Sequence, residues 1–171
     1  DLDRNHWISA AIDLERASVL GLCGDYVGAV SMATRGAAEA SGCGWLKGQA
    51  LACTNLAFFY VMLGRNSDAK QCVDSIPIRF RGAPAYRIAI AETLAQAKFA
   101  EGDFEGALSI LNETEVDGEP HLGWYKLSIA ITRTHLLLAL GNRSTARKCA
   151  VEAIPTARDL MNSAAERMLQ L

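Results

Sequence analysis

Proline is scarce in this sequence: only 4 of its 171 residues are prolines, whereas alanine is abundant. Scarce proline removes a common cause of helix interruption, and alanine loses no side-chain entropy in a helix, so the composition favours helices. The hydrophobic fraction is 50% and the charged fraction 21%, which excludes a disordered chain. A chain of this length can bury roughly 70% of the surface that it exposes when unfolded.

An excess of one charge is also missing, because 17 basic and 19 acidic residues give a formal net charge of −2. Nucleic-acid binding needs clustered basic residues, so we expect no direct contact with nucleic acid. No apolar run reaches the roughly 18–20 residues that span a bilayer. The longest, near Leu56–Leu63, is interrupted by Gly64, Arg65 and Asn66. We therefore expect no membrane contact.

The cysteines form no pairing pattern. Their number is odd, and no Cys-x-x-Cys motif occurs among Cys23, Cys43, Cys53, Cys72 and Cys149. Neither a disulfide framework nor a zinc site is indicated. Free cysteine often behaves as a small buried hydrophobe, and all except Cys43 lie in apolar helical patterns. We therefore expect buried thiols and a reducing, cytoplasmic compartment.

Residue combinations that carry catalysis are absent as well. His6, His121 and His135 are far apart, and none belongs to a His-x-x-x-His or His-Glu-x-x-His motif. The glycines around Cys43 lack the lysine of a phosphate-binding loop. Without a nucleophile beside a base, or paired carboxylates, the sequence predicts no enzymatic activity, no metal site and no cofactor.

What the sequence does contain is a repeated unit, in which a glycine is followed five residues later by an alanine. The glycines lie 40, 38 and 39 residues apart (64−24, 102−64, 141−102), and such regular spacing indicates a structural repeat. Glycine permits the left-handed backbone that ends a helix, and the small alanine lets the next helix pack closely. The four pairs are Gly24 with Ala29, Gly64 with Ala69, Gly102 with Ala107 and Gly141 with Ala146.

The repeats predict four helix hairpins and a terminal helix, within a single all-α domain over residues 1–171. Pro77, Pro84 and Pro120 fall between predicted helices, where proline is tolerated, whereas Pro155 is expected to kink or end its helix. The four units span about 5–41, 45–76, 84–114 and 121–160, and the terminal helix about 162–171. Their helices cover about 5–23 and 26–41, 45–63 and 66–76, 84–101 and 104–114, and 121–140 and 143–160.

The repeated unit resembles the tetratricopeptide repeat. The second unit carries the pattern over Asn55–Gly64 and at Ala69, while the fourth departs from it at Arg133 and Thr134. The other matches are Ala17, Gly24, Tyr26 and Ala29 in the first unit, and Leu94, Ala95, Gly102, Phe104 and Ala107 in the third. A standard unit has 34 residues. The longer units are similar to the helical-repeat sensor domains of maltose-regulator-type bacterial transcription activators.

This resemblance implies a right-handed superhelical stack, an α-solenoid, whose first helices line a concave face that binds a protein or peptide. Phe58, Phe59 and Tyr60 cannot all point into one core, and the family pattern places Phe58 on the concave face. The alternative is that Phe58 packs inward and Phe59 faces outward. The residues that the resemblance places on that face are Thr54, Phe58, Glu92, Gln96, Ile131 and His135.

Two functions follow from the resemblance. The first is a protein- or peptide-binding module, regulatory or scaffolding, with possible self-association. The second is an inducer-sensing arm that controls the oligomerisation of a bacterial transcriptional regulator. The chain begins at Asp1 and stops within the helix-like run Ala164–Leu171, so we expect it to be a fragment of a longer protein.

Overall fold

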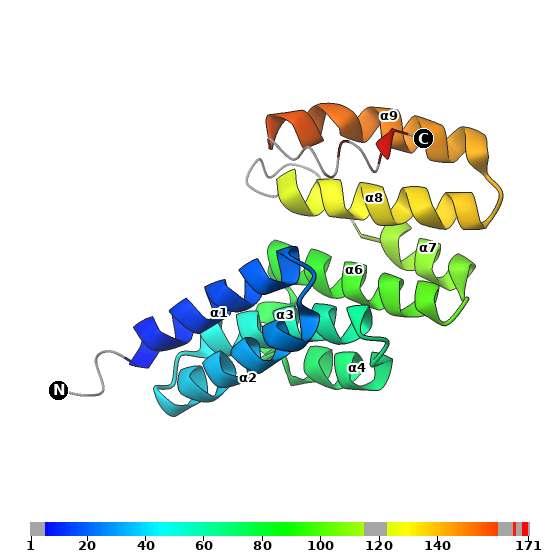
Figure 1. Cartoon of the computed structure of the whole chain (residues 1–171). Coiled ribbons are helices and arrows are strands. Elements are labelled where there is room, and N and C mark those ends of the chain that lie inside the picture. Colours follow the sequence, from blue (N-terminus) through cyan, green and yellow to red (C-terminus); the bar gives the residue numbers. More distant parts are fainter. Residues whose placement is uncertain (1–5, 115–122, 161–165, 167–168, 171) are drawn as a thin grey trace. The chain divides into compact units, whose positions relative to one another are not determined.

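The computed structural model describes residues 6–114, 123–160, 166, 169 and 170. Within those residues all regular secondary structure is helical, as Figure 1 shows, and no strand occurs. The all-α prediction is therefore confirmed for the described part of the chain. The handedness of a stack and the number of repeats stay predictions.

The helices begin and end close to the predicted residues, with one addition. A short helix, α5, follows Pro77, and Arg81 closes it by donating from Nε to the carbonyl oxygen of Ile76 at 2.8 Å. The predicted terminal helix lies mostly outside the described residues. The elements are α1 (His6–Leu22), α2 (Tyr26–Gly42), α3 (Leu46–Met62), α4 (Asn66–Ser75), α5 (Ile78–Arg81), α6 (Pro84–Ala100), α7 (Phe104–Asn112), α8 (Gly123–Ala139) and α9 (Arg143–Asp159).

The chain divides into two compact units, Asp1–Tyr86 and Arg87–Leu171, and the division falls in the first turn of α6. In the first unit α1 packs against α2, and α3 packs against both α2 and α4. In the second unit α8 packs against α7 and α9. Figure 1 shows the pairs α1 with α2 and α8 with α9 side by side. The single-domain organisation stays a prediction.

The turn glycines end the first helix of each hairpin in the same way. Gly24 has a φ of 82°, its N–H donates to the carbonyl of Gly21, and the next N–H, of Asp25, donates to Leu20 at 2.9 Å. This pair of bonds is the Schellman motif, which glycine permits because its backbone has no Cβ penalty at positive φ. The same pattern occurs at Gly64, Gly102 and Gly141, and also at Gly44 between α2 and α3.

Two of these turns start the following helix with an aspartate cap. Asp25 accepts a hydrogen bond from the backbone N–H of Gly28 at 2.9 Å, and Asp103 accepts one from Gly106 at 2.9 Å. Each carboxylate satisfies one of the free N–H groups in the first turn of a helix. A Gly-Asp pair therefore ends one helix and begins the next within two residues.

Small residues fill the contacts between helices. The four repeat alanines Ala29, Ala69, Ala107 and Ala146 are all at most 1% exposed. In the first unit Leu14, Ala17, Ala29, Ala33, Ala52, Leu56 and Phe59 form one hydrophobic cluster. In the second unit Leu127, Ala150, Ala153, Ala157 and Leu169 form another.

The fourth repeat departs from the tetratricopeptide pattern for a local reason. Arg133 extends from α8 and donates to the carbonyl oxygen of Leu111 at 2.8 Å, near the C-terminus of α7. A cation there satisfies a carbonyl group and interacts favourably with the helix dipole. The arginine therefore joins α7 to α8 at a position where the repeat pattern has leucine.

Pro155 does not end its helix, contrary to the prediction, because α9 continues to Asp159. Proline removes the hydrogen bond to the carbonyl four residues earlier, which here belongs to Val151. Val151 is exposed, so water can satisfy that carbonyl group. The position of Pro155 on the exposed side of α9 therefore makes it tolerable.

Candidate interaction surface

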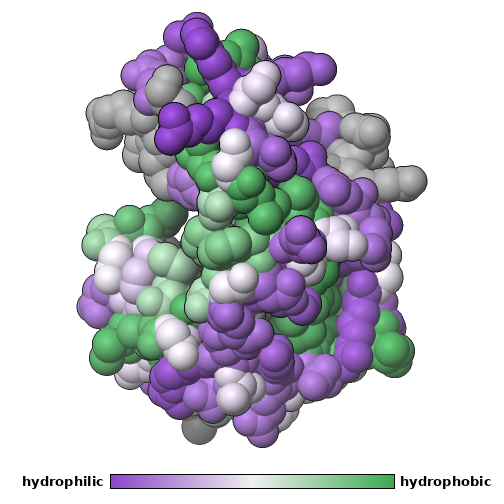
Figure 2. All heavy atoms as spheres, turned by 90° about the vertical axis from the view of Figure 1, so that its right-hand side faces the viewer, coloured by the Kyte–Doolittle hydropathy of each residue, from purple (hydrophilic) through white to green (hydrophobic). Residues whose placement is uncertain are grey.

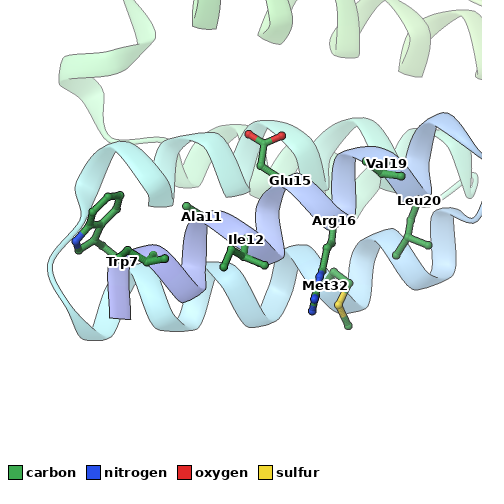
Figure 3. Close-up of a pocket in the computed structure, with 9 residues that line it drawn as sticks. Trp7, Ala11, Ile12, Glu15, Arg16, Val19, Leu20 and Met32 are labelled. Atoms are coloured by element: carbon green, nitrogen blue, oxygen red, sulfur yellow. The ribbon is translucent and has the colours of Figure 1, made fainter. Parts of the chain in front are cut away.

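The first helix, α1, exposes one apolar face while its opposite face packs into the first unit. Ala10, Leu14 and Ala17 are buried on the inner face. The exposed side forms a groove of about 730 Å³ that Trp7, Ile8, Ala11, Ile12, Glu15, Arg16, Val19 and Leu20 line together with Met32 of α2 (Figure 3). The exposed fractions are 52% for Trp7, 42% for Ile8, 48% for Ile12, 58% for Val19 and 76% for Leu22.

Exposed hydrophobic residues are not unusual one at a time. Figure 2 shows one face of the molecule, where hydrophobic residues (green) reach the surface between hydrophilic ones (purple). On α1, however, they lie together along one helix, and a contiguous apolar surface often marks an interaction site. We call the face formed by Ile8, Ile12, Glu15, Val19 and Leu22 the α1 face.

The α1 face follows the spacing of a coiled-coil seam. Its five positions are separated by 4, 3, 4 and 3 residues (12−8, 15−12, 19−15, 22−19). That alternation keeps side chains on the side of a helix that faces a partner helix. Glu15 is the one charged member of the seam.

The corresponding face of α3 is covered. Ile12 and Val19 lie 12 and 5 residues before Gly24, and Ala52 and Phe59 lie 12 and 5 residues before Gly64. Ala52 and Phe59 are buried in the cluster that residues of α1 and α2 form. The α1 face is therefore the surface on which a preceding helix pair packs in the next repeat, and here it is open.

Close approach between helices explains how Phe59 is covered. A Cβ atom on Gly21 would lie 2.5 Å from the Phe59 ring, so the glycine makes room for that ring. Tyr26 lies on the same ring, with centroids 6.5 Å apart. Covering this face in α3 thus requires small and aromatic residues from both α1 and α2.

A polar contact recurs at one position of this face. Asn55, nine residues before its turn glycine, donates to Ser18 at 3.3 Å. Thr132, also nine residues before its glycine (141−132), accepts from Gln96 at 3.4 Å. Ser18 and Gln96 both lie six residues before theirs (24−18, 102−96). Glu15 holds the same position as Asn55 and Thr132, and it has no hydrogen-bond partner among the described residues.

An ion pair fixes α1 on α2 behind the α1 face. Arg35 of α2 donates from Nε and from an Nη atom to the two carboxylate oxygens of Asp13, whose side chain is buried. The hydrogen bond from Arg35 is the main cause that lowers the pKa of Asp13, and burial opposes it. At one end Trp7 meets Trp45 edge-on, with ring centroids 6.3 Å apart. These contacts hold the α1 face in a defined orientation on the first unit.

The predicted residues of the first unit lie on α3, away from the α1 face. Thr54 donates to the carbonyl of Ala50 at 2.9 Å within its own helix. Phe58 is partly buried and stacks edge-on with Tyr26, with centroids 6.4 Å apart. Phe59 is buried, so the alternative in which Phe59 faces outward is wrong. Phe58 is the more exposed of the pair, and its role in binding stays a prediction.

Glu92, predicted on an open face, is instead buried, at 7% exposure, between α6 and α8. Its Oε1 accepts hydrogen bonds from Ser128 Oγ, from Gln96 Nε2 at 3.1 Å and from Thr132 Oγ1 at 3.5 Å. Burial raises the pKa of Glu92, and the three hydrogen bonds partly offset that effect. The expectation of an accessible carboxylate is corrected here, because consecutive first helices meet at this position.

The remaining predicted residues are only partly accessible. Gln96 bonds to Glu92 and Thr132 in the same polar cluster. Ile131 packs beside Leu127 in the cluster of the second unit, and His135 on α8 is partly buried. The structure thus brings Glu92 and Gln96 together, while a role in binding for Gln96, Ile131 and His135 stays a prediction.

The cysteines offer little reactive thiolate. Cys23 is exposed, contrary to the prediction, while Cys43, Cys53, Cys72 and Cys149 are partly buried. Burial raises the pKa of Cys53, and chiefly burial raises that of Cys72 to about 11. The thiolate is the nucleophilic form, so both side chains are unreactive thiols at neutral pH.

Two searches over the described residues gave no site of another kind. No group of three or more His, Cys, Asp or Glu side chains is arranged to hold a metal ion in that part of the chain. None of the described helices combines the length and the apolar character needed to cross a bilayer.

Comparison with known proteins adds no relative: no family model, no curated protein and no solved structure matches this chain.

Proposed function

We propose that this chain is a protein- or peptide-binding module of the tetratricopeptide kind and that the α1 face is its principal binding surface. The observation that carries the proposal is the contrast between two equivalent faces. Ala52 and Phe59 are covered in α3, whereas Ile12 and Val19 are exposed in α1. The repeated Gly and Ala positions support the assignment to that repeat class.

The chemistry of the α1 face suits an amphipathic helix. Its seam spacing matches the heptad of a second helix, and its centre is aliphatic apart from Glu15. Fully burying one aliphatic side chain contributes about 1.5–3 kcal/mol, and these side chains start about half exposed, so each contributes less. Ordering the partner opposes this gain. A partner with its own heptad of apolar residues, already helical, fits best.

An inducer-sensing arm would need a different site. Small-molecule pockets combine an apolar lining with a few convergent polar groups that orient the ligand. In the groove on α1, Glu15 and Arg16 point to opposite sides of the helix (Figure 3). That arrangement suits a helix lying along the groove better than a small ligand within it.

The proposal is tested with a designed three-heptad peptide that has leucine at every a and d position and carries a fluorescent label. We expect its anisotropy to rise on titration with the wild-type chain. Ile12→Glu places a charge in the seam and should weaken binding about tenfold or more. Val151→Glu changes an equally exposed valine on α9 and should leave binding unchanged. Equal affinity of the wild type and Ile12→Glu would contradict the proposal.

A further inference from the structure

We propose that the partner of the α1 face is a second copy of this chain, with the two α1 helices packed in parallel about a two-fold axis that runs along them. The inference rests on the proposed function, since it names the occupant of the same face. It is carried by the seam spacing of α1, by the placement of Glu15 and Arg16, and by the chemistry of the opposite end of the chain.

In a parallel pair, the seam residues take the a and d positions of a heptad. Ile12 and Val19 are then at a, while Ile8, Glu15 and Leu22 are at d, and Arg16 is at e. A β-branched residue at a with an apolar residue at d favours two strands in a parallel coiled coil. Ile12 and Val19 satisfy this preference, and all five seam residues are exposed and available.

Charge complementarity selects the parallel arrangement. Figure 3 shows Glu15 and Arg16 on opposite sides of α1. A two-fold axis along the helix exchanges the two sides, so the Glu15 of each copy faces the Arg16 of the other. In knobs-into-holes packing a d side chain enters a hole that includes the e residue of the facing helix, which here is Arg16. An antiparallel pair would keep both Glu15 carboxylates on the same side.

Both charged groups are available for this exchange. Glu15 and Arg16 are exposed, and neither forms an ion pair within the part of the chain that the structure describes. Glu15 also holds the position at which α3 and α8 each make a polar contact with a neighbouring first helix. In the dimer the arginine of the partner supplies that contact at α1.

The last hairpin offers no matching face for head-to-tail pairing. On α9 the exposed residues include Arg147, Lys148, Glu152 and Arg158, a mostly charged surface. Leu169 already covers the apolar cluster between α8 and α9. A face that finds no complement elsewhere in its own chain pairs with itself, and a two-fold axis closes such an interface. The dimer therefore closes through α1.

A seam of this size predicts a weak, reversible dimer. α1 has 17 residues and is about 25 Å long at roughly 1.5 Å per residue. Interfaces of one helix face lie at the small end of protein contacts, where association depends on concentration. Sedimentation velocity over a concentration series is therefore the appropriate measurement.

The decisive experiment uses two charge variants of the whole chain, Glu15→Arg and Arg16→Glu. Each places like charges across its own seam and should raise the dimer dissociation constant about tenfold or more. When the two variants are mixed, arginines of one copy meet glutamates of the other at both sides. We expect the mixture to recover the wild-type dissociation constant. Val151→Glu serves as a control that dimerises as the wild type does.

The outcomes separate this inference from the proposed function. A wild-type chain that stays monomeric throughout the series, or a dimer that Ile12→Glu leaves intact, overturns the dimer through α1. Variants that dimerise singly, or a mixture that does not recover, overturn the parallel arrangement. Circular dichroism checks that the variants stay helical. A monomeric chain that still binds the leucine-heptad peptide would leave the proposed function standing while removing the second copy as its partner.

Discussion

Glu92 is the residue whose environment differs most from that of an ordinary surface carboxylate. It is buried among Ser128, Thr132 and Gln96, and its pKa is raised mainly by burial. A folded-state pKa above the unfolded value means that stability is fully present below the unfolded pKa, about 4.3. That stability is lost as the pH rises through the folded pKa. Ionised Glu92 therefore destabilises the second unit at neutral pH.

We accordingly predict that Glu92→Gln raises the thermal midpoint at pH 7 and has little effect near pH 4. The amide keeps an acceptor for Ser128 and adds an N–H donor. Gln96 Oε1 is buried without a hydrogen-bond partner among the described residues, so it can accept that donor. Thermal melts of the wild type and the variant from pH 4 to pH 8 measure the difference. A variant less stable than the wild type at pH 7 would show that the carboxylate is required.

At the scale of elements, the turns between helices depend on single glycines. Gly44 lies between α2 and α3 with a φ of 69°, and a Cβ there would meet no neighbouring atom. The cost of replacing it is therefore backbone strain alone. Gly42, two residues earlier, ends α2 with equally open space around it.

These two glycines form a matched pair of substitutions. We expect Gly44→Ala to lower the free energy of unfolding by about 1–2 kcal/mol, because an L-residue is strained in left-handed backbone. Gly42→Ala should be neutral or stabilise by up to about 1 kcal/mol, since alanine is preferred in a helix. Urea denaturation of both variants gives the comparison. Equal effects at the two positions would show that backbone conformation is not what requires Gly44.

The sequence predicted the elements well because their signals are local. Turn glycines, capping aspartates and apolar spacing act within a few residues, so the bounds of α1, α2, α3 and α6 agree with prediction within about two residues. The helix α5 was missed because its closure depends on Arg81 reaching back to Ile76. Pro155 was misinterpreted because its cost depends on the exposure of Val151, which the sequence does not state.

At the scale of the whole molecule, dimerisation links stability to concentration. A partner that binds only the folded chain raises the thermal midpoint by mass action, so the midpoint of the wild type should rise with protein concentration. Ile12→Glu should show no such dependence. Calorimetry at two concentrations about a hundredfold apart measures both, and the midpoint difference follows the logarithm of concentration. A wild-type midpoint independent of concentration would argue against association of the folded chain.

The binding surface could be predicted only in part. The seam of Ile8, Ile12, Glu15, Val19 and Leu22 is visible as a heptad in the sequence, yet the same spacing also occurs on helices that are fully packed. Its counterpart in α3 is buried by α1 and α2. Which copy of the face stays open depends on which helices neighbour it, and that is a tertiary property.

By itself the sequence determined the helical class, the positions of the turns and the small residues at helix contacts, because glycine conformation and helical periodicity are properties of short segments. Only the tertiary structure decided which polar residues are enclosed and which apolar ones are exposed. Glu92 lies inside because Ser128 and Thr132, 36 and 40 residues away in sequence, come within hydrogen-bond distance of it. Ile12 lies outside because no described helix packs over it. Burial is set by contacts between segments far apart in the chain, and local patterns do not encode those contacts.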